Sequence, residues 1–326
     1  MAVCMSAAYC VPAKAGTQDW TPAFAGVQLT FMKTLLMLSA ASVLTAAAPP
    51  AKPKTPSEIV AEAPASAWRD IKADDLVVMD LRNGARVVIQ LAPDFAPVHS
   101  ANIRALAKGG WWSGSTIYRV QDNYVVQWGN NESTKPLPAG VVAKPPAEYH
   151  RSLKGLAVRP LGFADDYAPS AGFAGGWPIG YDSKAGTANL THCYGYVGVG
   201  RDLSPDTGTG GELYAVIGHA PRHLDRNLAV VGRVIDGIDR LSSLPRGTEA
   251  LGFYKDESMH VPISSVRLAS EIPAAERPAY QYMDTGSATF AAYLKGRANR
   301  KDDFFIRPAG GVDLCNAAVP VRKKPA

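Results

Sequence analysis

The sequence predicts a mainly β domain, and three observations support this fold class. Residues 75–83 and 85–91 are two runs rich in β-branched side chains, and an Asn-Gly pair joins them. Such a pair between two β-rich runs predicts a hairpin, because both residues tolerate positive φ. Residues 114–129 form an apolar, β-rich segment, and residues 261–269 alternate between apolar and polar side chains as a strand does.

The size and composition of the chain fit one large or two small globular domains. Its 326 residues are 47% hydrophobic and 19% charged, which is enough apolar material for a proper core. The formal net charge of +5 is spread along the sequence, apart from a short basic run at residues 322–324. We interpret that run as a solvated tail and expect no nucleic acid among the partners.

The segment that starts at Met32 has the layout of a secretory signal peptide. One lysine precedes an apolar core at residues 35–44, and small residues follow it. This core is shorter than the ~20 apolar residues that a membrane span needs. We therefore expect residues 1–31 to be a misassigned extension, residues 32–48 to be the signal peptide, and the protein to be periplasmic or secreted, without an integral membrane span after cleavage. A membrane-anchored form that keeps the segment is the alternative.

Further local patterns predict a linker and three helices. Residues 49–67 are rich in Ala, Pro and Lys, which predicts a flexible linker, with order beginning near Trp68. Residues 93–108 begin with prolines, place most apolar side chains on one face and end before two glycines, as a helix does. Shorter helical patterns occupy residues 236–244 and 287–300.

The segment 114–129 places one cation inside an apolar stretch. Arg119 precedes the aromatic and apolar pair Tyr124-Val125, and Gln127 supplies a neutral amide shortly afterwards. An arginine on an alternating strand is often an outward, solvated residue. The functional alternative is a shallow apolar pocket with a fixed guanidinium at its edge, which could hold a proline ring while Arg119 donates hydrogen bonds to a peptide group.

The order Gly-Ser-Thr-Ile-aromatic-Arg-Val, then aromatic-apolar-apolar-Gln-x-Gly, resembles the motif of the cyclophilin peptidyl-prolyl cis-trans isomerases. That family reads roughly Gly-Ser-x-Phe-His-Arg-Val-Ile-Pro-x-Phe-Met-Ile-Gln-Gly-Gly-Asp. By this resemblance Arg119 is the catalytic arginine, Gln127 the family's glutamine, and Tyr124 and Val125 the pocket phenylalanine and methionine. Tyr118 replaces the family's histidine. The resemblance implies a closed, eight-stranded antiparallel barrel capped by two helices.

The same resemblance assigns further substrate-binding residues downstream. The segment 194–217 corresponds to the family's groove strand, turn and pocket aromatics, and the segment 219–233 to a later pocket segment. His223 stands where many members have a tryptophan, and Leu228 where many have a histidine. The residues so assigned are Gly200, Arg201, Glu212, Leu213, Tyr214, His223, Leu224 and Leu228.

The family comparison also predicts the domain organisation. We expect a cyclophilin-like isomerase domain at residues 68–270. Residues 131–193 are longer than the family's path between the same landmarks and rich in Pro and Gly, so we expect a long inserted loop region with few periodic elements. Residues 271–326 form a C-terminal extension whose role the sequence does not specify.

Cys193 and Cys315 are the only cysteines after the predicted signal peptide. In an oxidising compartment they are expected to form a disulfide, and two unrelated buried thiols are the alternative, since spacing does not determine connectivity. The His and Asp residues of the insertion have no zinc-type spacing, so we expect no metal site. The resemblance implies no cofactor.

The resemblance implies a peptidyl-prolyl cis-trans isomerase that acts on proline-containing polypeptides among exported proteins, and we expect a monomer. Arg119 would donate to the substrate amide, and Gln127 would hold the substrate carbonyl. A proline-binding periplasmic chaperone or assembly module with little catalysis is the alternative, favoured by the changes at the family's histidine, methionine and tryptophan positions. An exported hydrolase has less support, because the chain lacks a Gly-x-Ser-x-Gly elbow.

Overall fold

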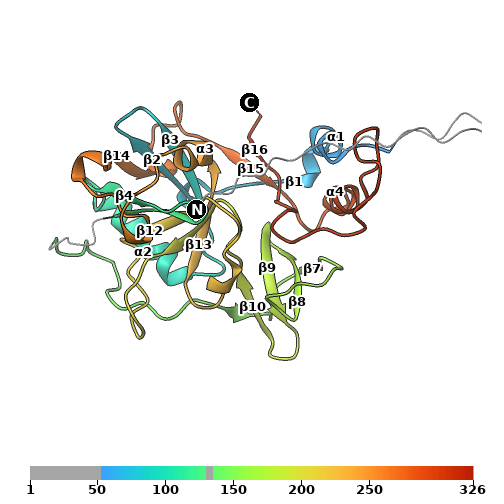
Figure 1. Ribbon diagram of the computed structural model, residues 1–326, viewed down its shortest axis with the longest axis horizontal. Coiled ribbons are helices and arrows are strands. Elements are labelled where there is room, and N and C mark those ends of the chain that lie inside the picture. Colours follow the sequence, from blue (N-terminus) through green and yellow to red (C-terminus); the bar gives the residue numbers. More distant parts are fainter. Residues whose placement is uncertain (1–52, 130–134, 326) are drawn as a thin grey trace, which may run out of the picture. The chain divides into compact units, whose positions relative to one another are not determined.

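A computed structural model describes residues 53–129 and 135–325. The predicted misassigned extension and signal peptide therefore lie outside the described residues. The central feature is a closed antiparallel barrel of eight strands in the order β11-β12-β5-β4-β14-β2-β3-β13, which confirms the predicted fold (Figure 1). Its strands are β2 (Leu76–Leu81), β3 (Arg86–Leu91), β4 (Thr116–Val120), β5 (Val125–Gly129), β11 (Tyr196–Val199), β12 (Leu213–Val216), β13 (Val230–Asp236) and β14 (Val261–Leu268).

The predicted Asn-Gly hairpin joins β2 to β3. Gly84 has a φ of 85°, which glycine adopts without a steric penalty. Asn83 contributes through its side chain, because its Oδ1 accepts a hydrogen bond from the Ala85 N–H at 3.0 Å. The turn therefore uses positive φ at the glycine and a side-chain contact at the asparagine.

Two α-helices accompany the barrel strands. Helix α2 (Pro97–Lys108) starts four residues later than predicted, because residues 93–96 form a turn in which Ala92 O accepts hydrogen bonds from the N–H groups of Phe95 and Ala96. Ile103 and Leu106 on α2 are fully buried in the barrel core. The short helix α3 (Ile238–Ser242) lies within the predicted range 236–244 and buries Leu241.

The insertion differs from the expected loop region, because it contains a five-stranded antiparallel sheet. The strands follow the order β6-β10-β9-β8-β7. Each strand is two to six residues long, which is too short for a clear sequence period. The presence of this sheet shows that the expectation of few periodic elements was wrong. The strands are β6 (Arg151–Ser152), β7 (Val158–Pro160), β8 (Ser170–Ala174), β9 (Trp177–Asp182) and β10 (Thr187–Leu190).

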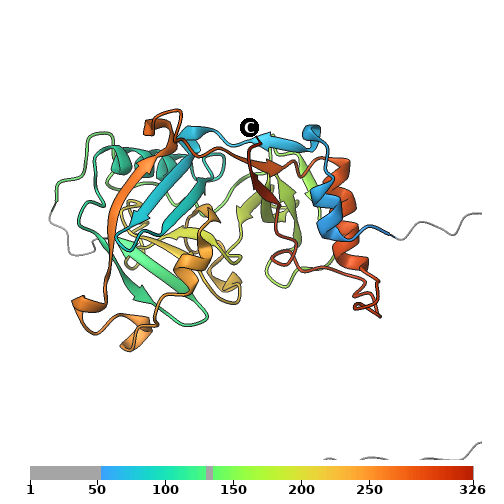
Figure 2. The same ribbon diagram turned by 90° about the horizontal axis from the view of Figure 1, so that it is seen from above.

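Part of the predicted flexible linker is helical. Helix α1 (Pro56–Ala61) begins with a capping box, in which the Thr55 side chain accepts from the Glu58 N–H and the Glu58 side chain accepts from the Thr55 N–H. Figures 1 and 2 both show α1 beside α4 (Ala288–Asn299), the helix predicted at residues 287–300. Capping and packing on α4 thus order a segment whose composition suggested a tether.

The N-terminal segment and the C-terminal extension share a third sheet, in the order β1-β15-β16. Its strands are β1 (Trp68–Asp70), β15 (Tyr280–Met283) and β16 (Val321–Lys323). Short 3₁₀ helices span Ala65–Ala67, Ala73–Asp75, Arg222–Leu224, Ala250–Gly252, Glu257–Met259 and Ala269–Glu271.

The insertion and the C-terminal extension pack on one another in a second hydrophobic core. Phe173 from the insertion meets Phe290 from α4 edge to face, with ring centroids 4.9 Å apart. Arg159 donates from Nη2 to the Gly286 carbonyl at 2.7 Å. Cys193 and Cys315 form a disulfide between the end of the insertion and the extension. These contacts join the insertion to the C-terminal extension, and the disulfide is the one that the sequence offered.

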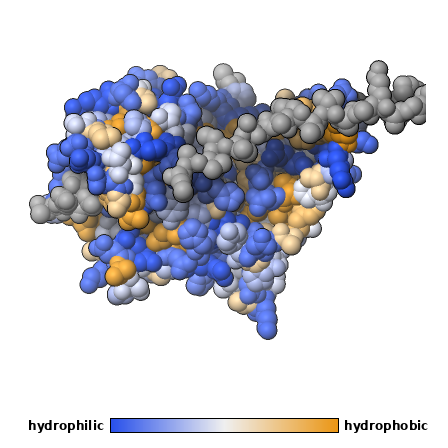
Figure 3. Space-filling model, in the orientation of Figure 1, coloured by the Kyte–Doolittle hydropathy of each residue, from blue (hydrophilic) through white to orange (hydrophobic). Residues whose placement is uncertain are grey.

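The surface facing the viewer in Figure 3 is mostly hydrophilic, with apolar residues in separate patches. The most exposed large apolar side chains include Leu203, Phe304 and Ile306. Within residues 53–129 and 135–325, no helix combines the length and the apolar character that crossing a membrane requires.

Candidate active site

A cavity of about 670 Å³ lies against the barrel wall formed by β4, β5 and β12. Its lining combines a polar part around Arg119 with an apolar part around Tyr214. The structure brings together most of the residues that the sequence predicted for the site. Those lining the cavity are Arg119, Tyr124, Val125, Gln127, Gly200, Arg201, Glu212, Tyr214, Leu224 and Leu228.

Strand pairing explains why three of these residues meet. Gln127 on β5 is paired with Arg119 on β4 and, across its other edge, with Tyr214 on β12. Directly paired residues point to the same face of a sheet. A register shift between Ile117 and Arg119 marks a bulge in β4, and both Tyr118 and Arg119 line the cavity. The barrel therefore presents the guanidinium, the amide and the aromatic ring in one row.

The Arg119 guanidinium is held in place by three acceptors. Nε donates to the Leu251 carbonyl at 2.7 Å, Nη1 donates to Gln127 Oε1 at 2.9 Å, and Nη2 donates to Gln121 Oε1. Its Cζ also lies 5.4 Å from the centroid of the Phe253 ring. Burial lowers the pKa of Arg119 from its usual value, but arginine remains ionised at neutral pH. The site thus contains a positioned positive charge.

A hydrogen-bonded chain continues from Arg119 along the polar wall. Gln127 Nε2 donates to Tyr118 Oη at 2.6 Å, and the Tyr118 hydroxyl donates to Glu212 Oε2 at 2.5 Å. Burial, reinforced by the nearby Glu212 carboxylate, raises the pKa of Tyr118 well above its ordinary value. Tyr118 is therefore a neutral hydrogen-bond donor at physiological pH, at the position where the family has a histidine.

The apolar part of the cavity rests on a small buried cluster. Val125, Tyr214 and Val216 form this cluster, and Leu228 packs against it. A Cβ added at Gly198 would lie 2.3 Å from the Tyr214 ring, so glycine is required where the ring crosses β11. Burial raises the pKa of the Tyr214 hydroxyl well above its usual range. The ring is thus a fixed, uncharged surface suited to an apolar group the size of a proline ring.

Two predicted substrate-binding residues do not line the cavity. Leu213 is 3% exposed and belongs to the barrel interior, where it is paired with Trp128. Strand alternation places Leu213 on the face opposite Tyr214, so it cannot share that residue's role. His223 is not among the lining residues either; its ring stacks on Tyr124 with centroids 6.3 Å apart.

Sequence reasoning also missed several lining residues. Tyr118 stood within the central motif and could have been found there as the replacement for the family's histidine. Leu251 and Phe253 lie in the irregular segment between α3 and β14, which has no period to suggest a role. Further residues that line the cavity without having been predicted are Asp202, Asp206, Gly208 and Thr209.

Comparison with known proteins agrees with this geometry. The family described as cyclophilin type peptidyl-prolyl cis-trans isomerase/CLD matches residues 76–268, which contain the whole barrel. Probable peptidyl-prolyl cis-trans isomerases of Brucella suis biovar 1 and Brucella melitensis biotype 1 are each 23% identical over 177 residues, covering 54% of this chain and 74% of theirs.

Among solved structures, cyclophilin AquaCyp293 from Hirschia baltica superposes with a TM-score of 0.62 at 23% identity, covering 84% of this chain and 99% of that chain. At this identity the superposition establishes a shared fold. The family match covers more than half of the present sequence and includes the strands that carry Arg119, Gln127 and Tyr214. The chain belongs to the cyclophilin-type peptidyl-prolyl cis-trans isomerases, as a divergent member.

Proposed function

We propose that the chain accelerates rotation about X-Pro bonds in exported polypeptides, with Arg119 as the electrophilic catalyst and without a cofactor. The observation that carries this proposal is the pairing of Arg119, Gln127 and Tyr214 on adjacent strands that line one cavity. A proline ring on the apolar part would lie beside the guanidinium, which is the arrangement that the reaction needs.

The chemistry follows from amide resonance. Rotation about the bond has a barrier of ~18–20 kcal/mol, because the nitrogen lone pair is delocalised into the carbonyl. A guanidinium N–H directed at the proline nitrogen stabilises the twisted state, in which the lone pair is localised on nitrogen. This interaction is stronger in the transition state than in the planar ground state, so it lowers the barrier. No covalent bond forms or breaks.

The remaining side chains position the substrate and Arg119. Gln127 accepts from Arg119, and its amide also donates to Tyr118. A substrate carbonyl could therefore replace one partner in these hydrogen bonds, while the guanidinium keeps its hydrogen bond to the Leu251 carbonyl. The apolar surface of Tyr214, Val125 and Leu228 excludes water and strengthens the electrostatic contact.

The exported context is supported by two features of the chain. The segment beginning at Met32 has the pattern of a signal peptide. The Cys193–Cys315 disulfide is of a kind that persists in oxidising compartments. Fractionation of cells that express the chain tests this part of the proposal. Recovery of the unprocessed protein in the cytoplasm would contradict it.

Turnover of a proline peptide tests the activity itself. Exchange between the cis and trans forms of an Ala-Ala-Pro-Phe peptide takes tens to hundreds of seconds without a catalyst. We expect catalytic amounts of the chain to bring exchange into a range that NMR exchange spectroscopy detects. Binding of the peptide without acceleration would instead support the proline-binding chaperone.

A further inference from the structure

We propose that His192 is a positioning residue for the peptide site, which fixes the Tyr214 ring through its hydroxyl and connects it to the insertion. This inference rests on the proposed function, because it assigns a determinant of substrate binding to the same cavity. His192 Nε2 lies 2.8 Å from Tyr214 Oη, and its Nδ1 lies 2.8 Å from Asp225 Oδ1. All three side chains are at most 5% exposed.

The partners of His192 define its tautomer. The Asp225 carboxylate only accepts hydrogen bonds, so the proton of this contact is on His192 Nδ1. The other ring nitrogen, Nε2, shares a hydrogen bond with the Tyr214 hydroxyl. A neutral phenol hydrogen-bonded at its far end has one favoured ring orientation. The contact at the hydroxyl thereby fixes the orientation of the Tyr214 ring that lines the cavity.

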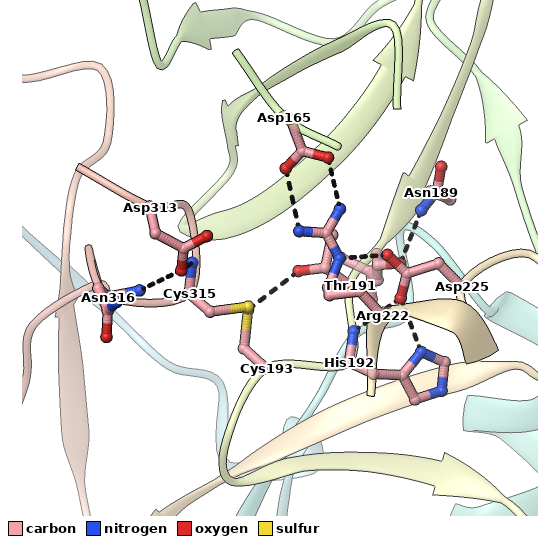
Figure 4. Close-up of a disulfide and its surroundings, with 11 residues drawn as sticks. Asp165, Asn189, Thr191, His192, Cys193, Arg222, Asp225, Asp313, Cys315 and Asn316 are labelled. Carbon is pink, nitrogen blue, oxygen red and sulfur yellow. Dashed lines mark hydrogen bonds and ion pairs between the residues drawn. A yellow bond between two sulfur atoms is a disulfide. The ribbon is translucent and has the colours of Figure 1, made fainter. Parts of the chain in front are cut away.

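Both carboxylate oxygens of Asp225 accept further hydrogen bonds. Its Oδ1 also accepts from the backbone N–H of His192 at 2.9 Å, and its Oδ2 accepts from Arg222 Nε. Arg222 then makes a two-pronged ion pair with Asp165 of the insertion, at 3.0 and 3.1 Å (Figure 4). Arg222 is only 4% exposed, so these contacts are largely shielded from water.

The chain of contacts therefore runs from the cavity to the segments outside the barrel. It passes from Tyr214 through His192 and Asp225 to Arg222, and ends on Asp165. Cys193, the residue after His192, forms the disulfide with Cys315 of the C-terminal extension, as Figure 4 shows. The insertion and the extension thus support the aromatic floor of the peptide site, which gives these additions to the barrel a role in substrate binding.

Two substitutions of His192 test its contacts to Asp225 and to Tyr214 separately. His192→Asn places an amide near the position of Nδ1, keeps a partner for Asp225 and loses the contact to Tyr214. His192→Gln has a longer side chain whose oxygen reaches toward the Tyr214 hydroxyl. Since one hydrogen bond contributes ~1 kcal/mol, we expect the Asn variant to raise KM and the peptide Kd about fivefold with little change in kcat. The Gln variant should recover most of the affinity.

Tyr214→Phe supplies the matched background, because it keeps the ring and removes only the hydroxyl. It should raise KM and Kd to a similar extent, and His192→Asn should add nothing in the Tyr214→Phe background. An equal effect of His192→Asn in both backgrounds would overturn the proposal, since the histidine would then act independently of the hydroxyl. A folded Tyr214→Phe variant with unchanged Kd would overturn it as well.

The binding measurement keeps this test separate from that of the proposed activity. Calorimetric titration with the Ala-Ala-Pro-Phe peptide reports Kd even if the chain does not accelerate exchange. Loss of affinity in Tyr214→Phe together with absent turnover in the wild type would support the positioning role and reject the isomerase. If His192→Asn does not fold, the Tyr214→Phe variant alone tests the proposal, because it removes the hydroxyl that contacts His192.

Discussion

At the scale of single residues, the side-chain amide of Gln127 connects two parts of the site. Gln127 accepts from Arg119 and donates to Tyr118, so it joins the positive charge to the polar wall. The place of Arg119 and Gln127 in one cavity was predictable, because both stand in a contiguous motif. The role of Tyr118 depends on a bulge that the motif does not encode. The resemblance placed Leu213 beside Tyr214 in the pocket, but adjacent residues of a strand point to opposite faces, so Leu213 lies in the barrel interior.

Substitution of Gln127 by Ala should lower kcat/KM about tenfold. The guanidinium would lose an acceptor, and a charge-assisted hydrogen bond is worth ~1.5–3 kcal/mol, part of which water would replace. Tyr118→Phe should have a smaller effect, because it leaves the contact between Arg119 and Gln127 intact. Steady-state kinetics with the proline peptide compares the two variants, with Tyr293→Phe as a control that removes a hydroxyl donating to the Ala318 carbonyl in the extension. The interpretation fails if Gln127→Ala is as active as the control.

At the scale of secondary-structure elements, the insertion contributes to the barrel helix as well as to the site. The N-cap of α2, Ala96, provides no side-chain cap. Instead the carboxylate of Glu148 accepts from the backbone N–H groups of Val98 and His99, each at 2.9 Å, and from His99 Nδ1 at 2.6 Å. A carboxylate at a helix N-terminus satisfies unpaired donors and interacts favourably with the helix dipole.

Replacement of Glu148 by Gln should lower the free energy of unfolding by ~1–2 kcal/mol, since the amide keeps the shape but loses the charge and one acceptor. Urea denaturation followed by circular dichroism measures the change. Glu249→Gln is a suitable control, because Glu249 caps no helix of comparable length. Equal stability of both variants would show that Glu148 does not cap α2 in solution.

A second contact between elements makes stability depend on pH. The Tyr280 hydroxyl on β15 donates to Asp236 at the end of β13, and burial together with this carboxylate raises the pKa of Tyr280. A raised pKa means that the folded state favours the protonated phenol. The stabilisation is therefore complete below the unfolded pKa of ~10 and is lost as the pH rises toward the folded value.

Wild-type protein should accordingly lose more unfolding free energy between pH 9 and pH 11 than the Tyr280→Phe variant. The variant has no phenol that can ionise at this position, so the difference between the two proteins isolates the contribution of this group. Chemical denaturation at several pH values provides the comparison. Parallel pH profiles would mean that Tyr280 ionises as easily in the folded chain as in the unfolded one.

At the scale of the whole described chain, one barrel carries the site and two added segments support it. The closed barrel was predictable because the central motif resembles that of the cyclophilins, while the hairpin and the helices are local signals. The sheet of the insertion was not, since its strands are short and gain their stability from non-local contacts such as that between Phe173 and Phe290. Sequence spacing likewise left the pairing of Cys193 with Cys315 open.

Removal of the disulfide tests whether the added segments stabilise the chain as a unit. The bridge joins residues 122 positions apart, so Cys315→Ser should lower the free energy of unfolding by ~2–4 kcal/mol. Denaturant titrations with and without reductant measure this effect. Reductant should destabilise the wild type and leave Cys315→Ser unaffected. A wild type that is insensitive to reductant at every denaturant concentration would contradict a stabilising bridge.

The most direct test of the account is the exchange rate of the proline peptide in the presence of Arg119→Ala. The substitution removes the only proposed electrophile, and loss of one such donor typically lowers the rate about 100-fold or more. Arg86→Ala provides the control, because Arg86 pairs with Asp80 on the barrel surface away from the cavity lining. We predict that kcat/KM falls about 100-fold in Arg119→Ala and is unchanged in Arg86→Ala. A folded Arg119→Ala variant with the wild-type rate would contradict the central claim.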